Sequence, residues 1–95
     1  MAGAFFNCSE LISVTISGNT TDIGNNAFDG CIRLTSVTIP DSVTSIGYGA
    51  FWYCNSLTSV TFSGKDKATV QGLANYSWEL PSGCVLHCTD GDITL

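Results

Sequence analysis

Positively charged side chains are scarce in this sequence of 95 residues. Arg33, Lys65 and Lys67 are its only basic side chains besides one histidine, and the net charge is −5. Nucleic-acid binding needs clustered lysines and arginines that replace counterions on the phosphate backbone. Attraction to an anionic membrane surface needs a similar cluster. The shortage of positive charge therefore argues against both kinds of partner.

Long apolar runs are also missing. No stretch approaches the roughly 20 apolar residues that a membrane-spanning helix requires, so we expect no membrane insertion. The start, MAGAFFNCSE, lacks the basic beginning and apolar centre of a secretory signal peptide. We expect either that the protein is not exported by that route or that the sequence is part of a longer chain.

Charged residues of both signs amount to only 12% of the sequence, about half of the usual share. Serine, threonine, asparagine and glycine supply the polarity instead. Such a composition favours β-structure and tight turns over long charged helices.

A repeat of fixed length is the dominant feature that is present. Cys8, Cys31 and Cys54 are each 23 residues apart. The same offset relates Ala4–Ala27–Ala50, Phe5–Phe28–Phe51, Leu11–Leu34–Leu57 and Val14–Val37–Val60. A period of this size predicts a solenoid, in which stacked turns share one continuous core.

Each turn divides into three parts. In LTSVTI, the alternation of Val37 and Ile39 with Ser36 and Thr38 predicts a short strand with one buried face. The stretch SVTSIG predicts a second short strand, and GAFWYC predicts one helical or 3₁₀ turn.

The segment IGNNAFDGCIRLTSVTIPDSVTSIGYGAF closely resembles the BspA-like leucine-rich repeat, whose pattern is approximately I-G-x-x-A-F-x-x-C-x-x-L-x-S-V-x-I-P. The resemblance covers about residues 4–62. It implies a leucine-rich-repeat-like, right-handed solenoid of short parallel strands. Known members are mostly bacterial, with some protozoan, and are surface or secreted proteins that are often adhesive. The resemblance thus implies a non-catalytic module that binds a protein or glycan ligand.

The register ends after Phe62, so we divide the chain into repeats at 1–62 and a C-terminal capping unit at 63–95. Val70, Leu73 and Ala74 predict a short amphipathic helix in that unit. CVLHCTDGDITL predicts a hairpin with Asp90-Gly91 as a type I′ turn pair. We expect the unit's core to contain Tyr76, Trp78 and Leu80. The fold class is α/β, mostly β.

Outward side chains of the strands form the first candidate binding surface. Ser13, Ser36 and Ser59 make one row, and Thr15, Thr38 and Thr61 make a second. Together they predict a flat, nearly uncharged hydroxyl face of the kind that solenoids use for partners. The alternative is that serine and threonine simply suit a β-surface. Ice binding by these rows is a further, weaker alternative.

Adjacent aromatic residues form the second candidate. Trp52 and Tyr53 replace Asp29 and Gly30 of the preceding turn. They either stack on a sugar or anchor an interface, or they pack on the C-terminal unit.

An open first turn supports a different function. No capping unit precedes it, and an open apolar edge tends to pair. This edge predicts a structural module that continues a longer array or forms a homo-oligomer with its own copy.

Cysteine and histidine offer little chemistry. The cysteines of the repeat should stack inside the coil as small apolar residues. Cys84 and Cys88 lack a second cysteine or histidine pair for zinc, and a disulfide between them stays open. His87 should face solvent, and the DGD sequence that begins at Asp90 fits a turn better than a calcium loop. We expect no catalytic residue, metal or cofactor.

Overall fold

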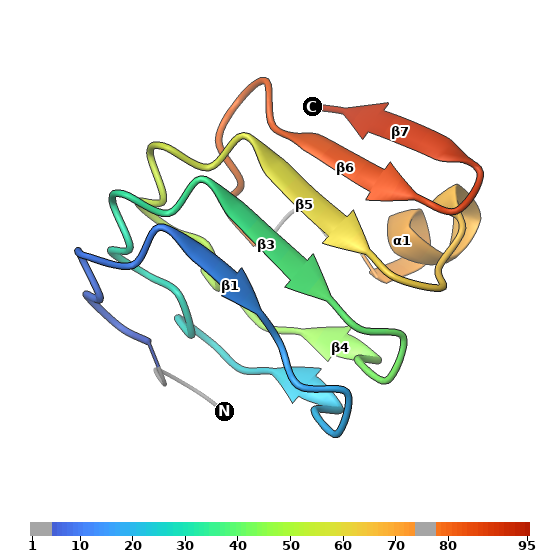
Figure 1. Cartoon of the computed structure of the whole chain (residues 1–95), viewed down its shortest axis with the longest axis horizontal. Coiled ribbons are helices and arrows are strands. Elements are labelled where there is room, and N and C mark those ends of the chain that lie inside the picture. Colours follow the sequence, from blue (N-terminus) through green and yellow to red (C-terminus); the bar gives the residue numbers. More distant parts are fainter. Residues whose placement is uncertain (1–4, 74–77) are drawn as a thin grey trace.

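The computed structural model describes residues 5–73 and 78–95. The expectations for Ala4, Ala74 and Tyr76 therefore lie outside the described residues. Three strands of the repeats lie side by side and parallel (Figure 1): β1 (Ser13–Thr15), β3 (Ser36–Ile39) and β5 (Ser59–Phe62). The short strands β2 (Asp22–Ile23) and β4 (Ser45–Ile46) form a second parallel pair behind them. The predicted solenoid is confirmed.

Strand register follows the 23-residue period. Val14 pairs with Val37, and Val37 pairs with Val60, so identical inward side chains stack from turn to turn. The interior positions of the middle turn, among them Leu34, Val37 and Ile39, are essentially inaccessible to solvent. Phe5, Phe28 and Phe51 stack with ring centroids 5.1 and 5.5 Å apart. Burial of this shared apolar column is the main stabilising contribution to the array.

The corners between strands are single turns closed by i→i+3 hydrogen bonds, the 3₁₀ pattern that GAFWYC predicts, and they do not extend into a helix. Within the corner, Trp52 N–H donates to Gly49 and Cys54 N–H donates to Phe51. The intervening Phe51 N–H donates instead to Trp78 in the next turn, just as Phe28 N–H donates to Ala50. Alternate amides therefore link neighbouring turns, which prevents a continuous helix at the corner.

A helix and a hairpin complete the chain: α1 (Lys67–Leu73), β6 (Val85–Cys88) and β7 (Gly91–Thr94). β6 pairs parallel with β5 and β7 pairs antiparallel with β6, so the sheet order is β1-β3-β5-β6-β7. Val70 of α1 is fully buried, Trp78 stacks on Phe62 at 5.9 Å, and Leu80 is half-buried. The helix-plus-hairpin arrangement is as predicted.

The predicted hairpin turn is wrong by one residue. Cys88 pairs with Gly91, so the turn residues are Thr89 and Asp90 rather than Asp90-Gly91. Neither has a positive φ, which excludes a type I′ turn, whereas Gly91 has φ 127°. Tertiary contacts set the position of the turn. The Thr89 N–H donates to the backbone carbonyl of Lys65, and the Asp90 carboxylate accepts the backbone N–H of Lys67 at 2.8 Å.

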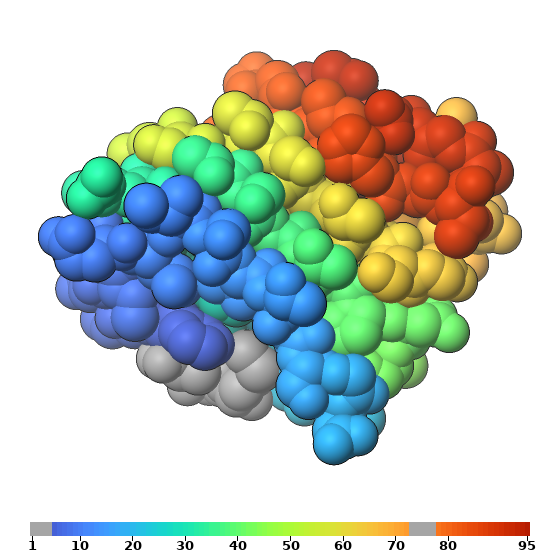
Figure 2. All heavy atoms as spheres, in the orientation of Figure 1, coloured from blue at the N-terminus to red at the C-terminus, as the bar shows by residue number. Residues whose placement is uncertain are grey.

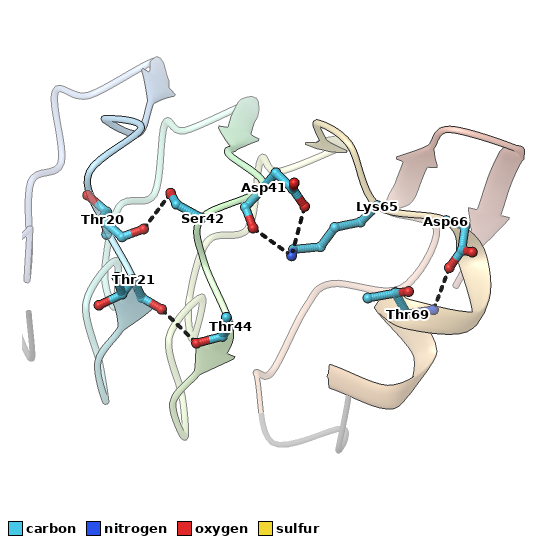
Figure 3. Close-up of polar contacts among 8 residues, drawn as sticks. All are labelled: Thr20, Thr21, Asp41, Ser42, Thr44, Lys65, Asp66 and Thr69. Carbon is cyan, nitrogen blue, oxygen red and sulfur yellow. Dashed lines mark hydrogen bonds and ion pairs between the residues drawn. The ribbon is translucent and has the colours of Figure 1, made fainter.

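Lys65 joins the repeats to the C-terminal unit (Figure 3). Its side chain is only 7% exposed, and Nζ donates to the Asp41 carbonyl oxygen at 2.9 Å. The Asp41 carboxylate lies 3.4 Å from the same nitrogen. In the preceding turns the neighbouring contacts are hydroxyl to carbonyl, from Ser42 to Thr20 and from Thr44 to Thr21. A buried cation replaces that pattern one turn later, at Lys65.

Candidate functional site

The strand face has the two rows of hydroxyls that the sequence predicts. Ser13, Ser36 and Ser59 are direct partners across the parallel strands, and so are Thr15, Thr38 and Thr61. Neighbouring strands lie about 4.8 Å apart, so each row is a regular line across the turns. Figure 2 shows this side of the molecule, where successive turns form adjoining bands from β1 to β7. The face is therefore continuous over the three repeated strands.

The hydroxyls of these rows are free to accept a partner. Neighbouring threonines use theirs within the fold, since Thr35 donates to the Ile12 carbonyl at 3.1 Å and Thr58 donates to Thr35 at 3.3 Å. For the six side chains of the two rows, the described part of the chain offers no hydrogen-bond partner. All six are exposed or half-exposed. They form an array of donors and acceptors that are not used within the described fold.

The rows continue into the C-terminal unit with different chemistry. Val85 lies beside Ser59, and His87 lies beside Thr61. His87 is about half exposed, as predicted for an outward strand residue, and its Nδ1 is 2.9 Å from the Asp92 carboxylate. Leu86 lies beside the inward Val60, but Val85 is apolar where the repeats have an outward serine, so VLH does not repeat the alternation of SVT.

Trp52 and Tyr53 lie in the corner that precedes β5, and they are 37% and 57% exposed. Their rings stack on each other with centroids 5.1 Å apart, and Tyr48 meets Trp52 edge-on at 6.2 Å. The described part of the C-terminal unit leaves both rings accessible. Tyr48, which is 54% exposed, was not predicted from the sequence, although it lies four residues before Trp52 in the same corner.

Three of the five cysteines, Cys31, Cys54 and Cys84, are buried, which makes their thiols poorly reactive. All five cysteines are free thiols, so Cys84 and Cys88 form no disulfide. Burial raises the pKa of Cys54 to about 12 and that of Cys84 to about 11. The Cys54 thiol also donates to the Phe28 carbonyl at 3.0 Å, and Cys31 donates to Phe5 at 3.1 Å. Since the thiolate is the nucleophile, these residues serve packing and not reaction chemistry.

No cluster of three potential metal-ligating side chains occurs among residues 5–73 and 78–95. Over the same residues, no helix is long and apolar enough to cross a membrane.

Comparison with known families agrees with the geometry. The family model for the BspA type leucine-rich repeat region (6 copies) matches residues 1–80. The chain belongs to the BspA-type leucine-rich repeat family. Repeat modules of this BspA type are generally non-catalytic, often serve adhesion or protein binding, and are typical of surface or secreted proteins. Neither curated proteins nor solved structures give a match.

The family match extends beyond Phe62 into the segment that contains α1 and Trp78. Trp78 accepts the Phe51 N–H at 3.0 Å, in the place that Ala50 takes for Phe28 one turn earlier. The boundary between repeats and capping unit at residue 62 stays a prediction.

Proposed function

We propose that this chain is a non-catalytic adhesive module of a surface or secreted protein, and that it binds a protein or glycan partner through the hydroxyl face. The rows of Ser13–Ser36–Ser59 and Thr15–Thr38–Thr61 carry the proposal, because their side chains are accessible and have no partner within the described fold. A regular array of hydroxyl donors and acceptors matches the repeating polar groups of an extended partner.

The low charge of this face sets the kind of binding that it supports. Without fixed charges, association does not gain from electrostatic steering, and affinity must come from many weak contacts over a broad area. Repetition of an identical row is a way to supply such contacts. Multiple copies of a module with this face would strengthen attachment through avidity.

Binding of the purified chain to immobilised matrix proteins and glycans tests the proposal. The triple variant Thr15→Lys, Thr38→Lys, Thr61→Lys should retain the fold and lose binding, because three ammonium groups project from the face. A matched control adds the same charge elsewhere, at the exposed residues Asn19, Gln71 and Ser82. Binding that is lost in the first variant and kept in the second supports the hydroxyl face. An equal loss of binding in the two variants indicates an effect of net charge. Binding that both variants retain contradicts the assignment to the hydroxyl face.

A second candidate function is assembly through the first turn. Phe5, Leu11 and Val14 are only half-buried, whereas their counterparts Phe28, Leu34 and Val37 are almost completely buried. We propose as the alternative that this end stacks on another array or on a second copy. Light scattering across a concentration series tests self-association. A mass that stays at 10.0 kDa contradicts it, and a rising mass that Leu11→Lys abolishes supports it.

A further inference from the structure

A shallow groove of about 490 Å³ lies at the corner of the turns that precedes the main strands. Its lining consists of two repeat positions taken from three successive turns, namely Asn7, Gly30 and Tyr53, and Ser9, Ile32 and Asn55. The groove therefore runs across the turns. Two strand spacings separate its ends, which is about 10 Å.

Gly30 leaves room for the side chain of Asn7. It has φ 82°, and a Cβ atom added there would collide with the side chain of Asn7. In the same column, Asn7 precedes it and Tyr53 follows it. The side chain of Asn7 therefore lies where a Gly30 side chain would project, and this places its amide at the groove.

Tyr53 has an unfavourable backbone conformation at this site. The column requires a positive φ in every turn, with 57° at Asn7, 82° at Gly30 and 61° at Tyr53. Glycine and asparagine adopt this left-handed region readily, whereas for a bulky side chain it costs about 1–2 kcal/mol. Retaining an aromatic side chain in the one strained position of the column indicates a role for its ring other than folding.

The ring of Tyr53 has one accessible face. Trp52 stacks on it with an interplanar angle of 6°, so the groove is bordered by the other face or by the ring edge. Tyr48 in turn packs edge-on against Trp52. The stack fixes the orientation of Tyr53, and a preoriented aromatic surface binds with a smaller entropic penalty.

Apart from Gly30 and the apolar side chain of Ile32, the remaining lining is polar and uncharged. Asn7 and Asn55 each provide an amide that donates and accepts, and Ser9 provides a hydroxyl. Because no lysine or arginine lines the groove, it lacks the groups that a phosphate or a nucleic-acid backbone requires. An aromatic face beside neutral amides and a hydroxyl is complementary to a ligand with hydroxyl groups on a ring that has an apolar face.

We propose that this groove binds a neutral oligosaccharide, with one sugar ring on Tyr53 and neighbouring hydroxyl groups on Asn7 and Asn55. The inference rests on the proposed function of a binding module, but it assigns a second site that is separate from the hydroxyl face. The ligand would lie across the turns, along the groove that Gly30 and its neighbours line.

Titration with cellohexaose, chitohexaose and maltohexaose, and with a sialylated oligosaccharide as the charged comparison, tests the proposal. Calorimetry measures affinity, and tryptophan fluorescence reports on Trp52 beside the site. Tyr53→Asn removes the ring but keeps a residue that suits the backbone, as Asn7 does two column positions earlier. Gly30→Asn also suits a positive φ, but its side chain takes the space of the Asn7 amide and displaces it from the groove. We expect at least one neutral hexasaccharide to bind, and each variant to weaken it at least tenfold.

The lysine triple variant of the hydroxyl face separates this proposal from the function proposed above. It should leave hexasaccharide binding unchanged, and Tyr53→Asn should leave attachment through the hydroxyl face unchanged. Circular dichroism verifies that each variant is folded. Absence of binding by all three neutral hexasaccharides overturns the groove proposal, and so does undiminished binding in both folded groove variants. Neither result affects the hydroxyl face.

Discussion

In the repeated turns, a residue lies beside its equivalent 23 positions later, whereas the C-terminal unit reaches the same sheet with a different spacing. Val37 pairs with Val60, but Val60 pairs with Leu86 rather than with Gly83. The repeats are held by identical side chains that stack in columns. The C-terminal unit is held by individual contacts, such as those of Lys65, Asp66 and Trp78. The stability of the repeats is therefore distributed along the columns, whereas that of the C-terminal unit depends on a few individual contacts.

The columns should be the most sensitive part of the molecule. Leu34→Asp places a carboxylate at a position with 0% exposure, among residues of all three turns. We expect a loss of more than about 4 kcal/mol, which is close to the whole stability of a domain of this size. Thr38→Lys, on the outer face of the same turn, should change the free energy of unfolding little. Circular dichroism and urea denaturation measure both, and a folded Leu34→Asp variant would show that the turns are independently stable.

The contact between the two regions should have an intermediate effect. Lys65→Ala leaves the Asp41 carbonyl without its donor and removes a buried aliphatic stem. We expect a loss of about 1–3 kcal/mol. Lys67→Ala is the matched control, since its side chain is half-buried and the helix retains its backbone contact with Asp90. An equal loss in the two variants in urea denaturation would mean that charge, not the Asp41 contact, is responsible.

Tyr53→Asn should have a small effect of the opposite sign. The strain of a tyrosine at φ 61° costs about 1–2 kcal/mol, and the stacking with Trp52 returns about 0.5–1.5 kcal/mol. The net change in the free energy of unfolding is a gain centred on about 0.5 kcal/mol, within a range of about −0.5 to +1.5 kcal/mol. Thermal and urea denaturation measure it. A loss above about 1 kcal/mol would assign the ring to folding and would remove the strain argument for the groove.

The same comparison explains what the sequence could predict. Strand register, the buried cysteines and the hydroxyl rows follow from the fixed offset. Residues separated by one repeat occupy equivalent positions in successive turns of a solenoid. The pairing of β6 with β5 and the turn at Thr89 and Asp90 depend on contacts with Lys65 and Lys67, which have no counterpart in earlier turns. No local pattern records such contacts.

The groove shows a further limit of reasoning from residue types. Trp52 and Tyr53 were predicted as a candidate surface, whereas Asn7, Gly30, Ser9, Ile32 and Asn55 were not. A signal for them is present in the alignment of the turns, since Asn7 and Gly30 at one repeat position indicate a left-handed backbone there. The next residue in that column is a tyrosine, and only the structure shows that it keeps the same φ.

The smallest effect that we predict concerns the start of α1. The Asp66 carboxylate accepts the Thr69 N–H at 2.8 Å (Figure 3), and hydrogen bonds from the Thr69 side chain and backbone lower the Asp66 pKa. A lowered pKa means that this carboxylate stabilises the fold above its unfolded pKa of about 4, and that the contribution is lost as pH falls through the lower folded value. Asp66→Ala should therefore weaken the fold at neutral pH, whereas Asp66→Asn keeps a capping side chain without the titration. Urea denaturation of the wild type and Asp66→Asn between pH 6 and pH 2.5 measures the difference. As the pH falls, the wild type should lose stability relative to Asp66→Asn. A difference in the free energy of unfolding that stays constant would show that the cap acts without its charge.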